Sequence, residues 1–126
     1  MENLIIAQTK QTPQIEFMVN DNYLRISGES YPENAMEVFQ PLIERIEQYF
    51  KQENRKLKVD LRVEWQNTSS SKMMYEIINR LSNYHLAGHS VKLAWFYVDG
   101  DMEMLENCEM FLEDVSFPYE IVAEKD

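Results

Sequence analysis

The hydrophobic residues of the first third of the chain fall in short runs separated by polar turns. Three such runs lie at 4–9, 15–19 and 23–27, and the tripeptide "NDN" at 20–22 separates the last two. Short apolar runs on either side of a polar turn are typical of a β-hairpin. We therefore expect an antiparallel hairpin here, with 4–9 as a short edge strand.

Three longer segments place their apolar residues three and four positions apart, which predicts amphipathic helices. The first covers 35–50 and contains Pro41, so a kink or a division into two pieces is expected there. The second begins near 68 and is expected to end at Gly88. The third covers 102–115.

The segments between these helices are predicted to be strands, at 57–65, 91–98 and "YEIVA" near the end of the chain. Residues 57–65 alternate strictly, with Leu57 through Trp65 on one side and charged residues on the other. A strand covered by helices on both faces would be continuously apolar. The predicted fold is therefore α/β: a two-layer mixed sheet with an N-terminal antiparallel hairpin, right-handed crossovers, and three helices mainly on one face.

The length and charge of the chain narrow its class. Its 126 residues suit a single domain, 1–126, and 22 acidic against 12 basic residues give a net charge of -10. That charge repels phosphate backbones and anionic membranes, so we expect no nucleic-acid and no membrane partner. The N-terminus lacks the features of a signal peptide, which indicates a cytoplasmic protein. Cys108 is alone among apolar neighbours and is expected to be buried.

Catalytic and metal-binding patterns find little support. The only histidines, His85 and His89, lie at the far end of the helix that the hydroxyl residues 68–71 open. A helix of about 16 residues spans roughly 24 Å, so a histidine cannot activate those hydroxyls within one chain. We interpret both histidines as exposed residues at a helix end. By elimination, the chain is predicted to be a non-enzyme without catalytic residues, metal or cofactor.

The acidic segment 99–103 resembles the start of a calcium-binding loop in its spacing. Asp99, Asp101 and Glu103 alternate, but the glycine that such a loop needs at its sixth position is missing. These residues are instead expected to cap the third helix and offset its dipole.

The segment "NTSSSK" at 67–72 carries four consecutive hydroxyls where one would be enough to cap a helix. Asn67, Thr68 or Ser69 could each serve as that cap, which is worth about 1 kcal/mol. Alternatively, the cluster presents a phosphoacceptor, because a helix N-terminus tolerates an anion and Lys72 is one turn away. A partner docked over a phosphorylated residue would have to desolvate the new charge, so the modification would weaken docking.

Three segments together resemble the SiaC-type regulatory phosphoprotein family: "ISGESYPENAMEVFQPL" (26–42), "NTSSSK" (67–72) and "WFYVDGDMEMLE" (95–106). The resemblance covers essentially the whole chain and implies a fold similar to STAS-domain anti-sigma-factor antagonists. In that family a kinase phosphorylates a threonine of the NTSS motif and a metal-dependent PPM-type phosphatase removes the phosphate. The unphosphorylated protein binds and activates a diguanylate cyclase. The matching threonine here is Thr68.

The turn "YPEN" is expected at the same sheet edge as Thr68, because both precede helices that follow parallel strands. We therefore expect a partner-binding surface around Thr68 that comprises Tyr31, Glu33, Asn34, Asn67, Ser69, Ser70 and Lys72. The turn could instead serve only to join a strand to a helix. Two other functions stay open: a STAS-like antagonist of a sigma-factor inhibitor, and a small-ligand binder or weak enzyme that uses 67–72.

Overall fold

The computed structural model describes residues 1–125, apart from the side chain of Trp65. The elements alternate in the predicted order β-β-β-α-β-α-β-α-β, with a short 3-10 turn, η1, between the second and third strands. They are β1 (Leu4–Ile6), β2 (Gln14–Met18), η1 (Val19–Asp21), β3 (Tyr23–Ser30), α1 (Ala35–Tyr49), β4 (Lys56–Gln66), α2 (Thr68–Leu86), β5 (Ser90–Val98), α3 (Met102–Leu112) and β6 (Tyr119–Glu124).

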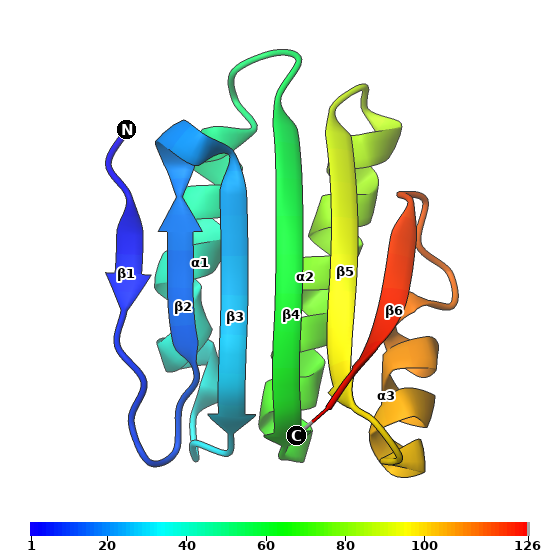
Figure 1. Cartoon of the computed structure of the whole chain (residues 1–126). Helices are drawn as coiled ribbons and strands as arrows, with labels where there is room; N and C mark the ends of the chain where they lie inside the picture. Colours follow the sequence, from blue (N-terminus) through cyan, green and yellow to red (C-terminus); the bar gives the residue numbers. More distant parts are fainter. Residues whose placement is uncertain (126) are drawn as a thin grey trace.

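The strands of the described chain form one six-stranded sheet whose spatial order follows the sequence, β1 to β6. The β1–β2 and β2–β3 pairs are antiparallel, whereas β3 to β6 run parallel to their neighbours. All three helices cover the same face of this sheet (Figure 1). The predicted mixed sheet, N-terminal hairpin and one-sided helical layer are therefore confirmed.

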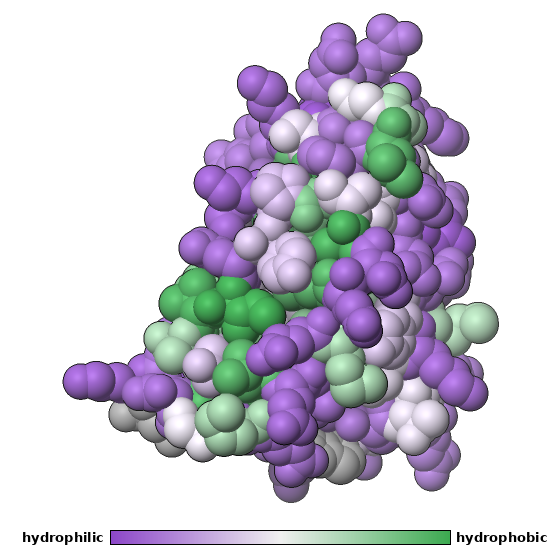
Figure 2. All heavy atoms as spheres, turned by 90° about the vertical axis from the view of Figure 1, so that its right-hand side faces the viewer, coloured by the Kyte–Doolittle hydropathy of each residue, from purple (hydrophilic) through white to green (hydrophobic). Residues whose placement is uncertain are grey.

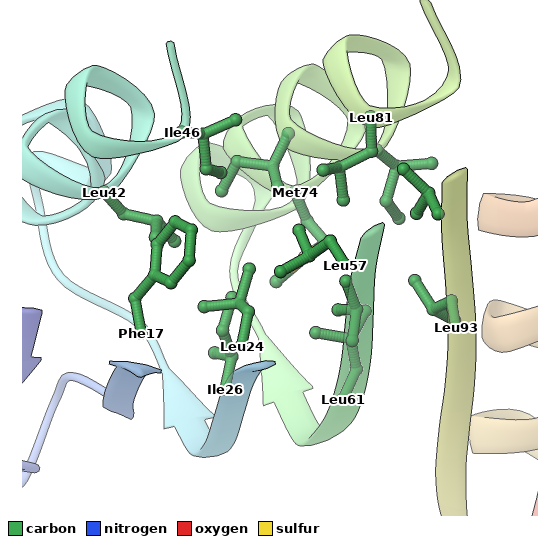
Figure 3. Packing of buried hydrophobic residues seen from close by; sticks show 14 of the residues in the cluster. Phe17, Leu24, Ile26, Leu42, Ile46, Leu57, Leu61, Met74, Leu81 and Leu93 are labelled. Atoms are coloured by element: carbon green, nitrogen blue, oxygen red, sulfur yellow. The ribbon is translucent and has the colours of Figure 1, made fainter. Parts of the chain in front are cut away.

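The hydrophobic core fills the space between the sheet and the three helices, and Figure 3 shows the part beneath α1 and α2. In β4, the residues from Leu57 to Val63 alternate as predicted, with every second side chain buried. The sequence pattern also predicts that Trp65 faces inward, but its side chain lies outside the described part of the structure. Outside β4, the largest buried side chains come from both the sheet and the helices. They include Trp95, Tyr49, Phe17, Phe39, Leu24, Leu42, Ile46 and Met74.

The face of the sheet without helices carries paired charges. Asp60 of β4 accepts a hydrogen bond of 2.7 Å from the Tyr23 hydroxyl and pairs with Lys58 at 3.0 Å. Burial, followed by the hydrogen bond to Asp60, raises the pKa of Tyr23 to about 12. This polar face explains why the strand alternates instead of being apolar throughout.

The side of the molecule on which β6 and α3 lie is largely hydrophilic, with apolar side chains gathered in its lower half (Figure 2). Among the exposed large apolar residues of α3 and β6 are Met102, Met110 and Tyr119. No helix of residues 1–125 has both the length and the apolar character that a membrane crossing requires.

Helix α1 passes through Pro41 as one continuous helix, so the predicted division into two pieces is wrong. Proline removes the hydrogen bond that its missing N–H would donate one turn back. Pro41 lies on the exposed side of the helix, where water can satisfy the carbonyl group left without a partner. The proline is therefore tolerated at this position.

Gly88 terminates α2, as predicted, but the prediction that His85 and His89 are exposed is wrong. Gly88 has φ 112° and donates to the His85 carbonyl, while His89 donates to the Tyr84 carbonyl, each at 3.2 Å. These two bonds form a Schellman motif. Both histidines are half-buried rather than exposed: the Nδ1 atoms of His85 and His89 accept hydrogen bonds of 3.1 Å from the backbone N–H groups of Val91 and Arg55.

We expect Gly88→Ala to lower the free energy of unfolding by about 1 to 2 kcal/mol, because the positive φ is unfavourable for a residue with a Cβ. A Cβ at this position meets nothing within 4 Å, so the loss reports backbone strain alone. Urea unfolding followed by circular dichroism measures it. Gly88→Asn is the matched control and should lose less, because asparagine tolerates the left-handed region. Equal stability of the alanine variant and the parent would contradict this interpretation.

Candidate functional site

The candidate site lies where β3 and β4 end and α1 and α2 begin. These strands are parallel and pair Ser30 with Gln66, so the connections that follow them emerge at the same edge of the sheet. This edge is the lower one in Figure 1. Open α/β sheets commonly carry their functional groups at the carboxyl ends of their strands. The structure thus brings the turn 31–34 and the segment 67–72 together, as predicted.

Asn67 joins the two connections and is the N-cap of α2. Its side-chain oxygen accepts from the N–H of Ser70 at 2.9 Å, and its side-chain nitrogen donates to the Pro32 carbonyl at 2.8 Å. Its backbone N–H donates to the Ser30 carbonyl at 3.0 Å. One residue therefore caps α2 and holds the turn before α1 in place.

Two serines of the cluster make further bonds between the helix starts. The hydroxyls of Ser70 and Ser30 are 2.7 Å apart, and both residues are fully buried. The Ser69 hydroxyl accepts from the N–H of Ala35, the first residue of α1, at 3.2 Å. The predicted contact between Ser70 and a partner is therefore wrong for this structure, because Ser70 exposes no surface that a partner could touch.

Thr68, the first residue of α2, differs from these neighbours. It is exposed, and no residue of the described chain forms a hydrogen bond with its hydroxyl or its backbone N–H. The exposed Lys72 lies four residues further along the same helix, so both side chains lie on one helical face. Among residues 68–71, Thr68 is the one that is exposed, and the fold does not use its hydroxyl.

The predicted residues of the turn occupy the same edge with different roles. Glu33 and Asn34 are exposed, and Tyr31 is half-buried. The Asn34 side chain also accepts from the N–H of Glu37 at 3.4 Å, which makes it the N-cap of α1. Both helices that begin at this edge are therefore capped by an asparagine.

A cavity of about 450 Å³ lies beside the candidate site and was missed from the sequence. It is bordered by α2, by α3 and by the ends of β4 and β5, and Ser71 and Gln66 are among its lining residues. Cys108 also lines it and is buried, as predicted, and this burial raises the pKa of its thiol to about 12. Such a thiol stays protonated at neutral pH and is a poor nucleophile.

The acidic residues at the start of α3 partly fulfil their predicted role. The Asp101 side chain caps α3 by accepting from the N–H of Met104 at 3.0 Å, and Glu103 lies in the first turn. Among residues 1–125, no group of three or more histidine, cysteine or acidic side chains is arranged to hold a metal ion.

Known proteins resemble the chain over nearly its whole length. A model of the family "SiaC family regulatory phosphoprotein" matches residues 6–124. A protein of Pseudomonas aeruginosa (strain UCBPP-PA14) is 38% identical over 123 residues, which cover 98% of each chain. The structure of SiaC of Pseudomonas aeruginosa matches with a TM-score of 0.92 and 38% identity, over 98% of this chain and 100% of that one. A crystal structure from the same organism, of the diguanylate cyclase SiaD with its activator SiaC, matches equally well, with a TM-score of 0.92, 38% identity and coverage of 96% and 99%.

We expect the buried Ser30–Ser70 hydrogen bond to show strong coupling in a double-mutant cycle. Either Ser30→Ala or Ser70→Ala alone leaves a buried hydroxyl without its partner and should lower the free energy of unfolding by about 1 to 3 kcal/mol. The double variant should lose clearly less than the sum of the two single losses. Urea unfolding of the four proteins measures the coupling, and purely additive losses would show that the two hydroxyls do not depend on each other.

Proposed function

Because this chain belongs to the SiaC family of regulatory phosphoproteins, we propose that it is a binding protein controlled by phosphorylation of Thr68. In its unmodified form it binds and activates a diguanylate cyclase, and a protein kinase and a PPM-type phosphatase set its state in the cytoplasm. The observation that carries this proposal is the exposed Thr68 hydroxyl, which the surrounding hydrogen-bond network does not use.

The neighbouring hydroxyls support the choice of Thr68. A kinase must bring the γ-phosphate of ATP in line with an accessible hydroxyl. Ser70 is fully buried, and the Ser69 hydroxyl already accepts from the start of α1. Ser71 is half-buried at the cavity. Thr68 is thus the most accessible acceptor of the four.

The position of Thr68 also makes a phosphate compatible with the fold. The group adds about -1.5 to -2 charges at pH 7, and a helix N-terminus stabilises negative charge through its dipole and free N–H groups. The N–H groups of Thr68 and Ser69 are not engaged by any described residue, and Lys72 is one turn away. The phosphorylated protein therefore stays folded.

The same phosphate acts on a docked partner. A protein that covers this edge has to remove water from a dianion and accommodate its volume where it otherwise meets a neutral hydroxyl. The surface concerned consists of Thr68 with Tyr31, Glu33, Asn34, Asn67, Ser69 and Lys72. The modification thus weakens docking while the scaffold remains intact.

The choice of a cyclase as partner rests on the relative from Pseudomonas aeruginosa, whose SiaC is the activator in a complex with the diguanylate cyclase SiaD. The match with that SiaC covers almost the whole of both chains. We assign no reaction to this chain itself: it acts by binding, and the enzymatic output belongs to the partner.

Incubation with the candidate kinase, ATP and magnesium should add one phosphate, and peptide mass spectrometry should locate it on Thr68. Thr68→Val, which keeps the shape of the side chain without the hydroxyl, should gain none. Phosphate on Ser71 in the parent protein, or an unchanged gain in the valine variant, would show that a different hydroxyl is the acceptor.

Thr68→Val should keep binding to the cyclase encoded by the same organism, whereas Thr68→Glu should weaken it at least tenfold, because a buried charge without a partner is costly. Calorimetric titration measures both affinities. Asn83→Glu is the matched control, since it adds the same charge at an exposed position near the other end of α2 and should bind like the parent. Equal affinities of the Thr68→Glu and Thr68→Val variants would contradict the electrostatic account.

A further inference from the structure

The cavity beside α2 is a feature separate from the phosphoacceptor. Thr68 does not line it, but Ser71 and Tyr75, which follow on the same helical face, do. Its other walls come from α3 and from the ends of β4 and β5. A partner that covers the start of α2 would therefore also lie over the mouth of this cavity.

Gln66 reaches the cavity because β4 contains an extra residue. Gly28 of β3 pairs with Val63, but the next residue, Glu29, pairs with Trp65, so Glu64 has no partner in β3. Such a bulge shifts the alternation of the strand by one position. As a result Val63 and Gln66, three residues apart, both line the cavity. Strict alternation would have placed them on opposite faces.

Two polar atoms of the cavity-lining residues lack hydrogen-bond partners within the described chain. They are the indole Nε1 of Trp95, a residue only 1% exposed, and the side-chain Oε1 of Gln66. Buried polar atoms are nearly always paired in folded proteins, because leaving them unpaired is costly. Both atoms are buried at the cavity wall, so a ligand that supplies an acceptor and a donor can pair with them only when exposed side chains of the wall, such as those of Tyr75 and Met110, shift.

Aromatic rings and methionines form the apolar wall. The Phe111 ring lies 4.2 Å from that of Tyr75 and 5.2 Å from that of Trp95, measured between centroids. Tyr75 and Met110 also line the cavity and are 38% and 58% exposed. Exposed methionines adapt their shape to a bound segment, and aromatic faces favour stacking with planar groups.

The charged residues that line the cavity are all acidic, although one of them, Glu64, also pairs with Arg62 of the same strand at 3.7 Å. Glu64, Asp101 and Glu103 line it, and no lysine, arginine or histidine does so among the described residues. Asp101 is held in place as the cap of α3. Fixed carboxylates next to an apolar wall attract a cationic group and repel an anionic one.

We propose that this cavity is an anchor pocket for an arginine residue of the protein that docks beside Thr68. The guanidinium stacks on the aromatic wall and donates to Gln66 Oε1 and the carboxylates, while a main-chain carbonyl of the same segment accepts from Trp95 Nε1. Arginine fits better than lysine because its planar group combines stacking with several donors in fixed directions. The identity of the occupant rests on the proposed function, but the chemistry of the pocket does not.

A small probe tests the pocket without any partner. Addition of N-acetyl-arginine methylamide should shift the Trp95 indole N–H signal in a ¹H–¹⁵N spectrum until the site is saturated. Because the chain has two tryptophans, the Trp65→Phe variant identifies which signal belongs to Trp95. The neutral isostere N-acetyl-citrulline methylamide should bind at least threefold more weakly. Glu103→Gln should weaken arginine binding at least threefold, whereas Glu113→Gln, exposed just after α3 and outside the lining, should leave it unchanged.

The results of these experiments test the arginine pocket independently of the proposed phosphorylation switch at Thr68. Equal binding of the arginine and citrulline probes, or no response of the Trp95 signal to either one, would overturn the arginine pocket. Thr68→Glu should change the affinity for the arginine probe by less than about threefold, because Thr68 lies outside the lining. A failed pocket therefore leaves the Thr68 switch standing, and a failed switch leaves the pocket standing.

Discussion

The start of α2 is fixed to the end of β3 by a hydrogen bond between two fully buried hydroxyls, those of Ser30 and Ser70. These residues are forty positions apart in the sequence, so the bond exists only once the sheet and the helix have packed. Asn67 reinforces the same junction through its side chain and its backbone N–H. Because buried hydroxyls tolerate little displacement once paired, the position of Thr68 follows from this network.

Two of the four hydroxyls at 68–71 take part in the structural hydrogen-bond network. Those of Ser69 and Ser70 hold the two helix starts, which leaves Thr68 presented to solvent on a firm support. Under the proposed function, a phosphate added there meets free N–H groups, so its charge acts on a visiting protein instead of on the fold. The neighbouring cavity extends the surface available to that protein, with negative charge and aromatic walls of its own.

The pattern of apolar residues predicted the sheet and helices well, because alternation at 57–63 and spacings of three and four report burial directly. Individual polar side chains were harder to predict, since their partners come from distant segments. Ser70 is polar in sequence but buried through Ser30, and His85 and His89 accept from backbone groups of neighbouring segments. The cavity was not predictable at all, because four separate elements and an irregular strand pairing form it.

Under the proposed function, phosphorylation of Thr68 changes what the protein binds and leaves its fold unchanged. Hydrogen exchange of the α2 amides, compared between the unmodified protein and one carrying phosphothreonine at position 68, shows whether the fold is unchanged. We expect equal or slower exchange in the first turn of α2 after modification, and unchanged exchange in α1 and in the sheet. Faster exchange throughout α2 would show that the phosphate disrupts the helix, and would rule out a switch that leaves the fold intact.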